Sequence, residues 1–298
     1  MTTQNMKIQF EQIVKKLNPE NKLLDVWELK GGISAQVTGL AVLQPNGQIK
    51  KLIVRQHGDV DYKQNPKIAA DEYKLLEILK SYGPPVPKPY YLDQSGEIFT
   101  RPYIVMEFID GTPEMNDMKI KELASILTKI HGLDSSKQDL SFLPKQEINF
   151  EKLLNRDTDN TLNQWTIREI LRSVFPFPNK NPQVILHGDF WPGNTLWKNG
   201  KLVGVIDWED AALGDPISDL GNGRLEVLFQ FGIEAMMDFT KHYKTLMTTY
   251  NYTDQPYWDL FAALRLSTFP EWGLDKNTEK TMREKHKWFV TQALEQIN

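Results

Sequence analysis

The 298-residue sequence predicts an α+β protein with two lobes, a small N-terminal lobe built on an antiparallel sheet and a larger, mainly helical C-terminal lobe. Two observations predict this class. Polar and apolar β-forming residues alternate over residues 23–56, whereas apolar residues recur at helical spacing over most of the chain after residue 108. Residues 109–113, which include Asp110-Gly111 and Pro113, are typical of a linker. We therefore place the two lobes at residues 1–107 and 108–298.

The N-terminal lobe is expected to open with an amphipathic helix and to continue as strands. A strand is expected at 26–29, and a hairpin with strands at 36–43 and 49–56 closes through a two-residue turn at Asn46-Gly47. The residues that predict the helix are apolar and near-helically spaced: Ile8, Phe10, Ile13, Val14 and Leu17. The residues of the second hairpin strand alternate between its faces, Leu52 and Val54 on one and Ile53 and Arg55 on the other.

A helix over residues 68–81 should follow, because Gly83-Pro84-Pro85 cannot continue it. Short strands are then expected at three places: residues 90–92, 98–100 and 103–107.

The C-terminal lobe shows helical patterns interrupted by one hairpin. A helical stripe runs from Ile120 to Ile130 and stops at His131-Gly132. Asn199-Gly200 is a second Asn-Gly turn, between strands at 195–197 and 202–206, and residues from about 224 onward are expected to be helical.

Composition excludes several classes of protein. There is no cysteine, so neither disulfides nor thiolate metal sites can form. No apolar stretch approaches the roughly 18 residues typical of a membrane span, and residues 1–16 lack the apolar core of a secretory signal, so we expect a cytoplasmic protein with no membrane partner. A pI of about 5.8 disfavours a nucleic-acid partner. Residues 1–107 hold 14 Lys+Arg and 12 Asp+Glu (net +2), and residues 108–298 hold 21 and 27 (net -6).

The strongest chemical signal lies between His187 and Asp219. It contains the segment His187-Gly188-Asp189 with Asn194 five residues after the aspartate, and Asp207 lies on the far side of the second hairpin. Because a hairpin returns the chain to its starting end, Asn194 and Asp207 can converge, and both offer the oxygen ligands that Mg²⁺ prefers. Asp189 can project beside the same metal, where a carboxylate can accept the proton of an attacking hydroxyl.

Two further acids complete the segment. Asp215 and Asp219, in and after Gly214-Asp215-Pro216, are expected to bind backbone groups or to cap the next helix.

The complete pattern, HGDFWPGN, IDWE, GDP and a final Asp, closely resembles the aminoglycoside phosphotransferase family, which includes choline-kinase-like enzymes and has a protein-kinase-like fold. The resemblance extends from about Gly31 to Leu266. It implies a bilobal kinase-like fold and a small-molecule kinase that uses ATP and Mg²⁺. By this resemblance Asp189 is the catalytic base, Asn194 and Asp207 are the Mg²⁺ ligands, and His187 supports the catalytic loop. Gly188 stands where the H-R-D motif of protein kinases has Arg.

The resemblance also implies nucleotide-binding residues in the N-terminal lobe. Arg55 stands where family members more often have the phosphate-binding Lys, and Glu72 is in place to pair with it. Gly31 and Gly32 lie where a phosphate-covering loop belongs. Backbone groups of Glu107 and Phe108 would bind adenine, and the apolar walls of that pocket would come from Ile53, Leu196 and Ile206.

The acceptor is expected to be a small-molecule alcohol. The acidic C-terminal lobe favours a cationic one, such as an aminoglycoside or an amino alcohol, while a neutral sugar, a nucleoside-like compound or a macrolide remains an alternative. A protein kinase is disfavoured because Gly188 replaces Arg and no A-P-E pattern follows Asp207. A pseudokinase that binds nucleotide without transfer, or a purely structural interaction protein, are the remaining alternatives.

Overall fold

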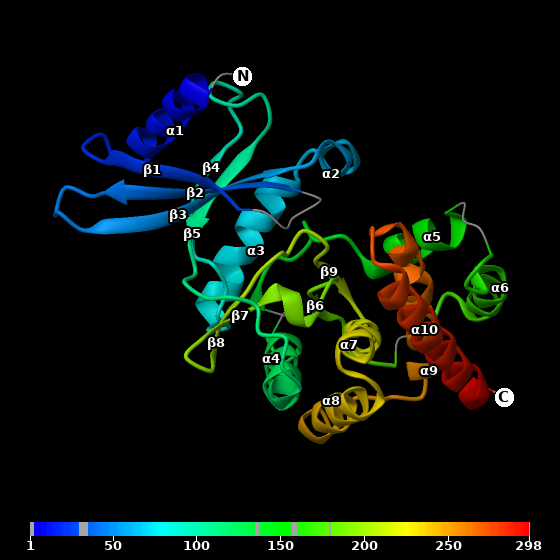
Figure 1. Ribbon diagram of the computed structural model, residues 1–298. Coiled ribbons are helices and arrows are strands. Elements are labelled where there is room, and N and C mark those ends of the chain that lie inside the picture. Colours follow the sequence, from blue (N-terminus) through cyan, green and yellow to red (C-terminus); the bar gives the residue numbers. More distant parts are fainter. Residues whose placement is uncertain (1–2, 30–34, 135–136, 157–159, 179, 298) are drawn as a thin grey trace. The chain divides into compact units, whose positions relative to one another are not determined.

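The computed structural model describes residues 3–29, 35–134, 137–156, 160–178 and 180–297 (Figure 1). The chain forms two compact units. Unit 1 consists of Met1–Gly111 and Leu196–Ile206, and unit 2 consists of Thr112–Thr195 and Asp207–Asn298. The N-terminal region is an antiparallel sheet with helices and the C-terminal region is mainly helical, which confirms the predicted fold class.

Unit 1 is built on a five-stranded antiparallel sheet in the order β1-β2-β3-β5-β4. Its elements are α1 (Thr3–Leu17), β1 (Lys22–Glu28), β2 (Ala35–Leu43), β3 (Ile49–His57), α2 (Asp59–Gln64), α3 (Ile68–Tyr82), β4 (Pro89–Asp93), β5 (Tyr103–Glu107), β7 (Thr195–Lys198, whose first residue falls in unit 2) and β8 (Lys201–Val205).

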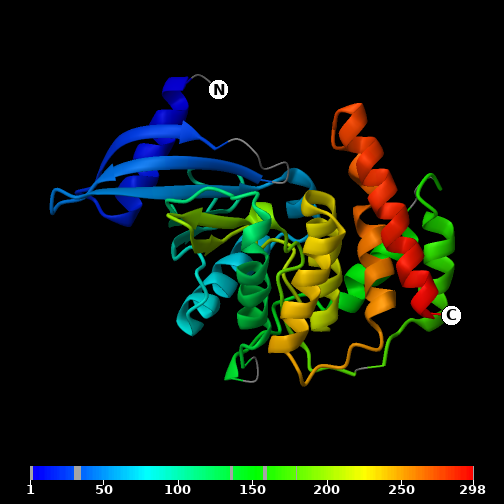
Figure 2. The same ribbon diagram turned by 60° about the horizontal axis from the view of Figure 1, so that its bottom comes forward.

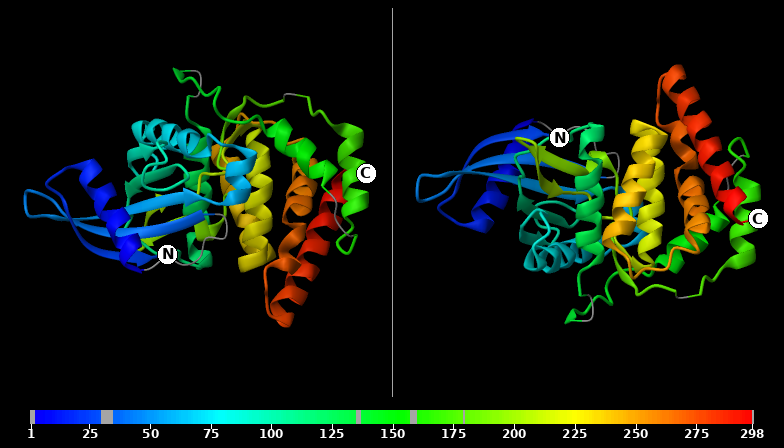
Figure 3. Two further views of the ribbon diagram at one scale, coloured as in Figure 1. Left: turned by 90° about the horizontal axis from the view of Figure 1, so that it is seen from above. Right: turned by 90° about the horizontal axis from the view of Figure 1, so that it is seen from below.

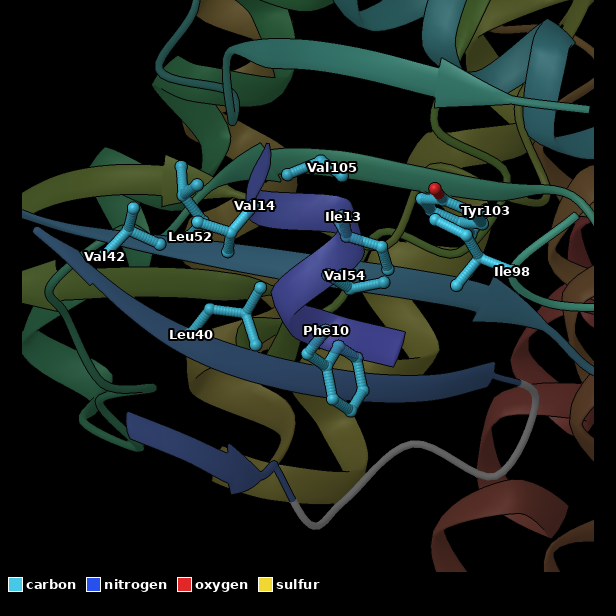
Figure 4. Close-up of a cluster of buried hydrophobic side chains, with 10 residues drawn as sticks. All are labelled: Phe10, Ile13, Val14, Leu40, Val42, Leu52, Val54, Ile98, Tyr103 and Val105. Atoms are coloured by element: carbon cyan, nitrogen blue, oxygen red, sulfur yellow. The ribbon is translucent and has the colours of Figure 1, made fainter. Parts of the chain in front are cut away.

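The two long helices of this unit cover opposite faces of the sheet. Helix α1 inserts Phe10, Ile13 and Val14 into a cluster that includes Leu52 and Val54 of β3 (Figure 4). Helix α3 lies on the other face, where its Glu72 meets Arg55 of β3. Because side chains alternate along a strand, β3 buries an apolar layer under α1 and brings Arg55 to α3, as its sequence pattern predicts.

Two local predictions in unit 1 are wrong. Residues 98–100 are not a strand. Ile98 is apolar because it packs into the α1 cluster as part of a bend. The first hairpin turn is longer than two residues, since Gln44 N donates to Gln48 O and encloses Pro45-Asn46-Gly47. Proline favours the second position of a type I turn, and Gly47 takes the left-handed conformation (φ 80°) that closes such a three-residue loop.

The second hairpin forms as predicted. Strands β7 and β8 pair as a two-stranded sheet, and Asn199 and Gly200 both have positive φ (51° and 72°), which is the conformation of a type I′ turn. The hairpin belongs to unit 1: Val205 N donates to Pro85 O, and Gly204 packs against Ile109.

Unit 2 is mainly helical (Figures 2 and 3). Its described residues also form a short two-stranded sheet, β6-β9. Helix α7 packs against both α8 and α9, and α9 packs against α10. The elements are η1 (Asp117–Lys119), α4 (Ile120–His131), α5 (Gln146–Asn155), α6 (Gln164–Val174), β6 (Val184–Leu186), η3 (Pro192–Asn194), β9 (Ala212–Gly214), α7 (Pro216–Phe231), α8 (Ile233–Leu246), α9 (Gln255–Arg265), η4 (Leu266–Glu271) and α10 (Lys276–Ile297).

Helix α7 begins eight residues before the expected start of the C-terminal helices, at Pro216 instead of about residue 224. The Asp215 side chain accepts a hydrogen bond from Ile217 N, so it caps this helix as predicted. Within the described residues, no helix is long and apolar enough to cross a membrane.

The packing of α1 predicts a contrast between two isoleucines of that helix. Ile13 is fully buried, whereas the Ile8 side chain is 49% exposed. We expect Ile13→Ala to lower the free energy of unfolding by about 2–4 kcal/mol, because it deletes buried methyl groups and leaves a cavity. Urea denaturation checks this, with Ile8→Ala as the matched control. Equal losses in the two variants would contradict the packing.

Candidate catalytic site

The loop that carries His187 and Asp189 is held at its start by one buried carboxylate. The loop follows β6, and Asp219 of α7 accepts hydrogen bonds from His187 N (2.6 Å) and Gly188 N (3.0 Å). Asp219 is 1% exposed, and its third contact is His131 Nε2 at 3.3 Å. Although burial alone raises the pKa of Asp219, hydrogen bonds and charge from His131 and His187 hold it below its ordinary value. The expectation that Asp219 binds backbone groups is confirmed.

Gly188 occupies a position that only glycine fits. Its φ is 81°, and a Cβ atom there would lie 2.0 Å from the carbonyl oxygen of Asp210. The Arg of the H-R-D motif is therefore excluded at this position by the close approach of two backbone segments. The same approach packs the His187 ring against Trp208, with ring centroids 4.5 Å apart. The loop of Asp189 thus lies directly against the turn that starts at Asp207.

His187 braces this loop. The residue is completely buried, and its Nδ1 accepts a hydrogen bond from Asp189 N at 3.3 Å. The role of His187 as support of a catalytic loop stays a prediction.

Asp189 is held at both carboxylate oxygens. Oδ1 accepts hydrogen bonds from both terminal nitrogens of Arg265 at 3.0 Å, and Oδ2 accepts one from Asn194 Nδ2 at 3.3 Å. Asn194 Nδ2 also donates to Asp189 O at 3.0 Å. The Asp189 side chain remains 31% exposed, so a hydroxyl group from solution can reach it.

Asn194 and Asp207 flank the β7–β8 hairpin, which returns the chain to the same end. The Asn194 side chain makes its two hydrogen bonds to Asp189 through Nδ2. Its Oδ1, on the other side of the amide group, therefore points away from Asp189. Asp207 has a φ of 69°, a conformation uncommon outside glycine that is often found at functional sites.

The side chains of these two residues are of the kind that could hold Mg²⁺. They offer one amide oxygen and one carboxylate, which are hard ligands. Within the described residues there is no cluster of three or more His, Asp or Glu suited to hold a metal. Mg²⁺ commonly takes one or two carboxylates from the protein and completes its coordination with substrate phosphates and water.

In unit 1 the structure brings Arg55 and Glu72 together. Arg55 Nε lies 3.3 Å from Glu72 Oε2, and both side chains are buried. The same carboxylate oxygen lies 2.7 Å from His57 Nε2. His57 was not predicted as part of this group, although it follows Arg55 by two residues and so shares its face of β3.

The other residues expected to bind nucleotide lie in the same unit. Ile53 is in β3, and Leu196 and Ile206 are at the base of the β7–β8 hairpin. Glu107 N donates to Lys88 O at 2.8 Å, so this amide is used within the sheet, which leaves the Glu107 carbonyl and the Phe108 backbone as candidates for adenine. Gly31 and Gly32 lie outside the described residues.

Three residues near Asp189 were missed from the sequence: Asp210, Glu226 and Arg265. Arg265 lies 76 residues after Asp189 and no local motif marks it. Glu226 of α7 is 5% exposed. Burial, reinforced by the charge of Asp189 and partly offset by Arg265, raises the pKa of Glu226 to about 8. Glu226 is therefore mostly protonated at neutral pH.

Comparison with known proteins matches residues 32–247 to a family model described as the phosphotransferase enzyme family (APH). Acyl-CoA dehydrogenase family member 10 from Mus musculus is 23% identical over 171 residues, which cover 50% of this chain and 16% of that protein. Member 11 from Rattus norvegicus is 25% identical over 177 residues, or 51% of this chain and 22% of that protein. The chain thus spans less than a quarter of the length of these two curated relatives.

Two solved structures are similar over nearly the whole chain. Choline kinase LicA from Streptococcus pneumoniae has a TM-score of 0.63 at 22% identity, covering 96% of this chain and 98% of that chain. A thermostable mutant of aminoglycoside phosphotransferase APH(4)-Ia has a TM-score of 0.65 at 13% identity, covering 95% and 98%. At these identities the likeness establishes the fold, and it agrees with the family that the motifs resemble.

The buried Glu226 predicts how stability depends on pH. Below the ordinary Glu pKa of 4.5 the carboxyl is protonated in both the folded and the unfolded state. Between 4.5 and about 8 only the unfolded state releases the proton, so the free energy of unfolding falls by up to about 1.4 kcal/mol per pH unit. Glutamine cannot ionise. The melting temperature of Glu226→Gln should therefore exceed that of the wild type by an amount that grows as the pH rises from 5 to 8.

Thermal denaturation at several pH values measures this difference. Glu234→Gln on the surface of α8 controls for the loss of one acidic residue. A melting-temperature difference between Glu226→Gln and the wild type that does not change with pH would contradict the burial of an ionisable carboxyl there.

Proposed function

Because the chain belongs to the phosphotransferase enzyme family, we propose that it is an ATP- and Mg²⁺-dependent phosphotransferase whose acceptor is a hydroxyl group of a small molecule. The observation that best supports this is the state of Asp189: a partly exposed carboxylate, fixed by Asn194 and Arg265, on a loop that packs against the turn at Asp207. Fixed, accessible carboxylates of this kind orient and deprotonate attacking hydroxyls.

Each residue has a role in this proposal. Asp189 orients the acceptor hydroxyl and takes its proton, while His187 and Asn194 hold the loop in place. Asn194 Oδ1 and the Asp207 carboxylate would hold the metal. When bound, Mg²⁺ neutralises phosphate charge and draws electrons from the transferred group.

The nucleotide side of the proposal lies in unit 1. Arg55, held by Glu72, binds phosphate, and a guanidinium can do so with two parallel hydrogen bonds. The Glu107 carbonyl and the Phe108 backbone bind adenine. The proposed apolar contacts to the base come from Ile53, Leu196 and Ile206. Similar solved structures include LicA with AMP and APH(4)-Ia with ADP and hygromycin B, which supports a nucleotide substrate.

For the acceptor we propose a cationic alcohol. The support is the net charge of -6 over residues 108–298, together with similar structures that carry hygromycin B and kanamycin or are named choline kinase. A neutral sugar or a macrolide is the alternative acceptor.

The test is a phosphorylation screen with Mg-ATP over hygromycin B, kanamycin, choline, neutral sugars and macrolides, with ADP release and product mass as readouts. We expect transfer to at least one cationic alcohol. Asp189→Asn should lower kcat by about 10²–10⁴-fold, because the variant keeps the shape but loses the base. Asp238→Asn, an exposed residue of α8, should keep wild-type activity.

Thermal shift with Mg-ATP separates the alternatives. A ligand that binds only the folded state raises the melting temperature, so we expect an increase for both the wild type and Asp189→Asn. A higher melting temperature without transfer to any acceptor would favour a pseudokinase. If the melting temperature does not rise and no phosphate is transferred, an interaction protein is favoured.

A further inference from the structure

We propose that Arg265 is a positioning residue that clamps the Asp189 carboxylate and ties the catalytic loop to the turn after Asp207. The catalytic part of this inference rests on the proposed function, whereas the clamp itself does not. Arg265 is the last residue of α9 and lies outside residues 32–247, which match the family model. The match to the family therefore does not assign it a role.

The hydrogen bonds of Arg265 use nearly its whole donor set. One terminal nitrogen, Nη1, donates to Asp189 Oδ1 (3.0 Å) and to Asn222 Oδ1 (2.7 Å). The other, Nη2, donates to Asp189 Oδ1 (3.0 Å) and to Asp210 Oδ2 (2.9 Å). A guanidinium has five N–H groups, and four are used here. Arg265 therefore cannot offer an incoming phosphate or carboxylate two parallel hydrogen bonds without breaking some of these bonds, which favours a clamp over an anion receptor.

The partners of Arg265 belong to three segments whose relative positions must be kept. Asp189 is on the catalytic loop and Asp210 is on the turn that begins at Asp207. Asn222 is on α7, and its Nδ2 donates to Phe190 O of the same catalytic loop at 3.3 Å. One planar group with a fixed fork of donors can satisfy three such acceptors at once, whereas a lysine ammonium is a compact point charge.

Charge also requires a cation at this place. Asp189 and Asp210 would repel each other if no cation lay between them. The Arg265 side chain is only 25% exposed, so solvent screens these charges incompletely. The carboxyl end of a helix adds a further preference for a cation.

The clamp assigns different tasks to the two oxygens of Asp189. Oδ1 is committed to Arg265, so Oδ2 is the atom left to meet the acceptor hydroxyl, and Asn194 limits its rotation. Loss of the clamp should misorient the base without touching the nucleotide side. Misplacement by about 1 Å can cost about 10²-fold in rate.

The test compares Arg265→Ala and Arg265→Lys with the wild type, using Mg-ATP and the fastest acceptor from the screen described above. We expect kcat of Arg265→Ala to fall about 10²-fold with the KM for Mg-ATP unchanged within about twofold. Guanidinium chloride at millimolar concentration should restore part of kcat, because it refills the space that the side chain leaves. Arg265→Lys should remain well below the wild type.

Hydrogen exchange provides a readout that needs no turnover. In the protein without ligands, amides of residues 187–194 and 207–210 should exchange at least about tenfold faster in Arg265→Ala and in Arg265→Lys. Arg224→Lys is the matched control: Arg224 is also a buried, ion-paired arginine between α7 and α9, through Asp259, with no bond to the catalytic loop among the described residues. It should leave exchange in both segments and kcat unchanged.

The two proposals can fail separately. Unchanged exchange in both Arg265 variants would overturn the clamp, and so would a wild-type kcat or a loss that guanidinium does not reverse. If Arg265→Ala does not fold, as judged by circular dichroism, Arg265→Lys decides by the same exchange and kcat criteria. If the wild type transfers phosphate to no acceptor, the proposed function falls, and faster exchange in the variants would still uphold the clamp.

Discussion

The segment that carries His187 and Asp189 depends on one buried carboxylate, that of Asp219. Burying an ionised acid is unfavourable unless hydrogen bonds replace its water, and here two successive amides of the loop and His131 do so. The network continues from His131 Nδ1 to Tyr243 Oη at 2.6 Å, so the start of the loop is tied to α4, α7 and α8 together. The position of Asp189 is thereby fixed by the helical core of unit 2.

Local charge at Asp189 differs from what counting residues indicates. The C-terminal part of the sequence is acidic, yet the carboxylates of Asp189 and Asp210 share one guanidinium, and burial favours the neutral form of Glu226. The proposed acceptor would therefore meet a weaker negative potential near Asp189 than a net charge of -6 over residues 108–298 suggests. Selectivity for a cation would have to come from acidic side chains farther from Asp189.

The sequence predicts those features that short-range patterns encode. Alternation located β3 and the two faces of its sheet, and Asn199-Gly200 located the second hairpin, because both signals lie within a few residues. Arg265 could not be found in this way, since its link to Asp189 exists only once α9 is packed. The error at residues 98–100 has the same origin: Ile98 is apolar because of a distant helix, and the backbone around it does not pair. His57 shows the intermediate case, visible from its place on β3 only after Glu72 is known to face that strand.

The β7–β8 hairpin has a consequence for how such proteins can recombine. Its residues come from the C-terminal part of the sequence, but they complete unit 1: Lys198 pairs with Asp110, Gly111 packs against Leu196, and Val205 N donates to Pro85 O. A crossover between two homologous genes near codon 111 would join a sheet from one parent to a hairpin from the other. A recombinant inherits unit 1 intact only if two segments are exchanged together, residues 1–111 and residues 196–206. The second segment is about a dozen codons long, and the proposed metal ligands Asn194 and Asp207 flank it.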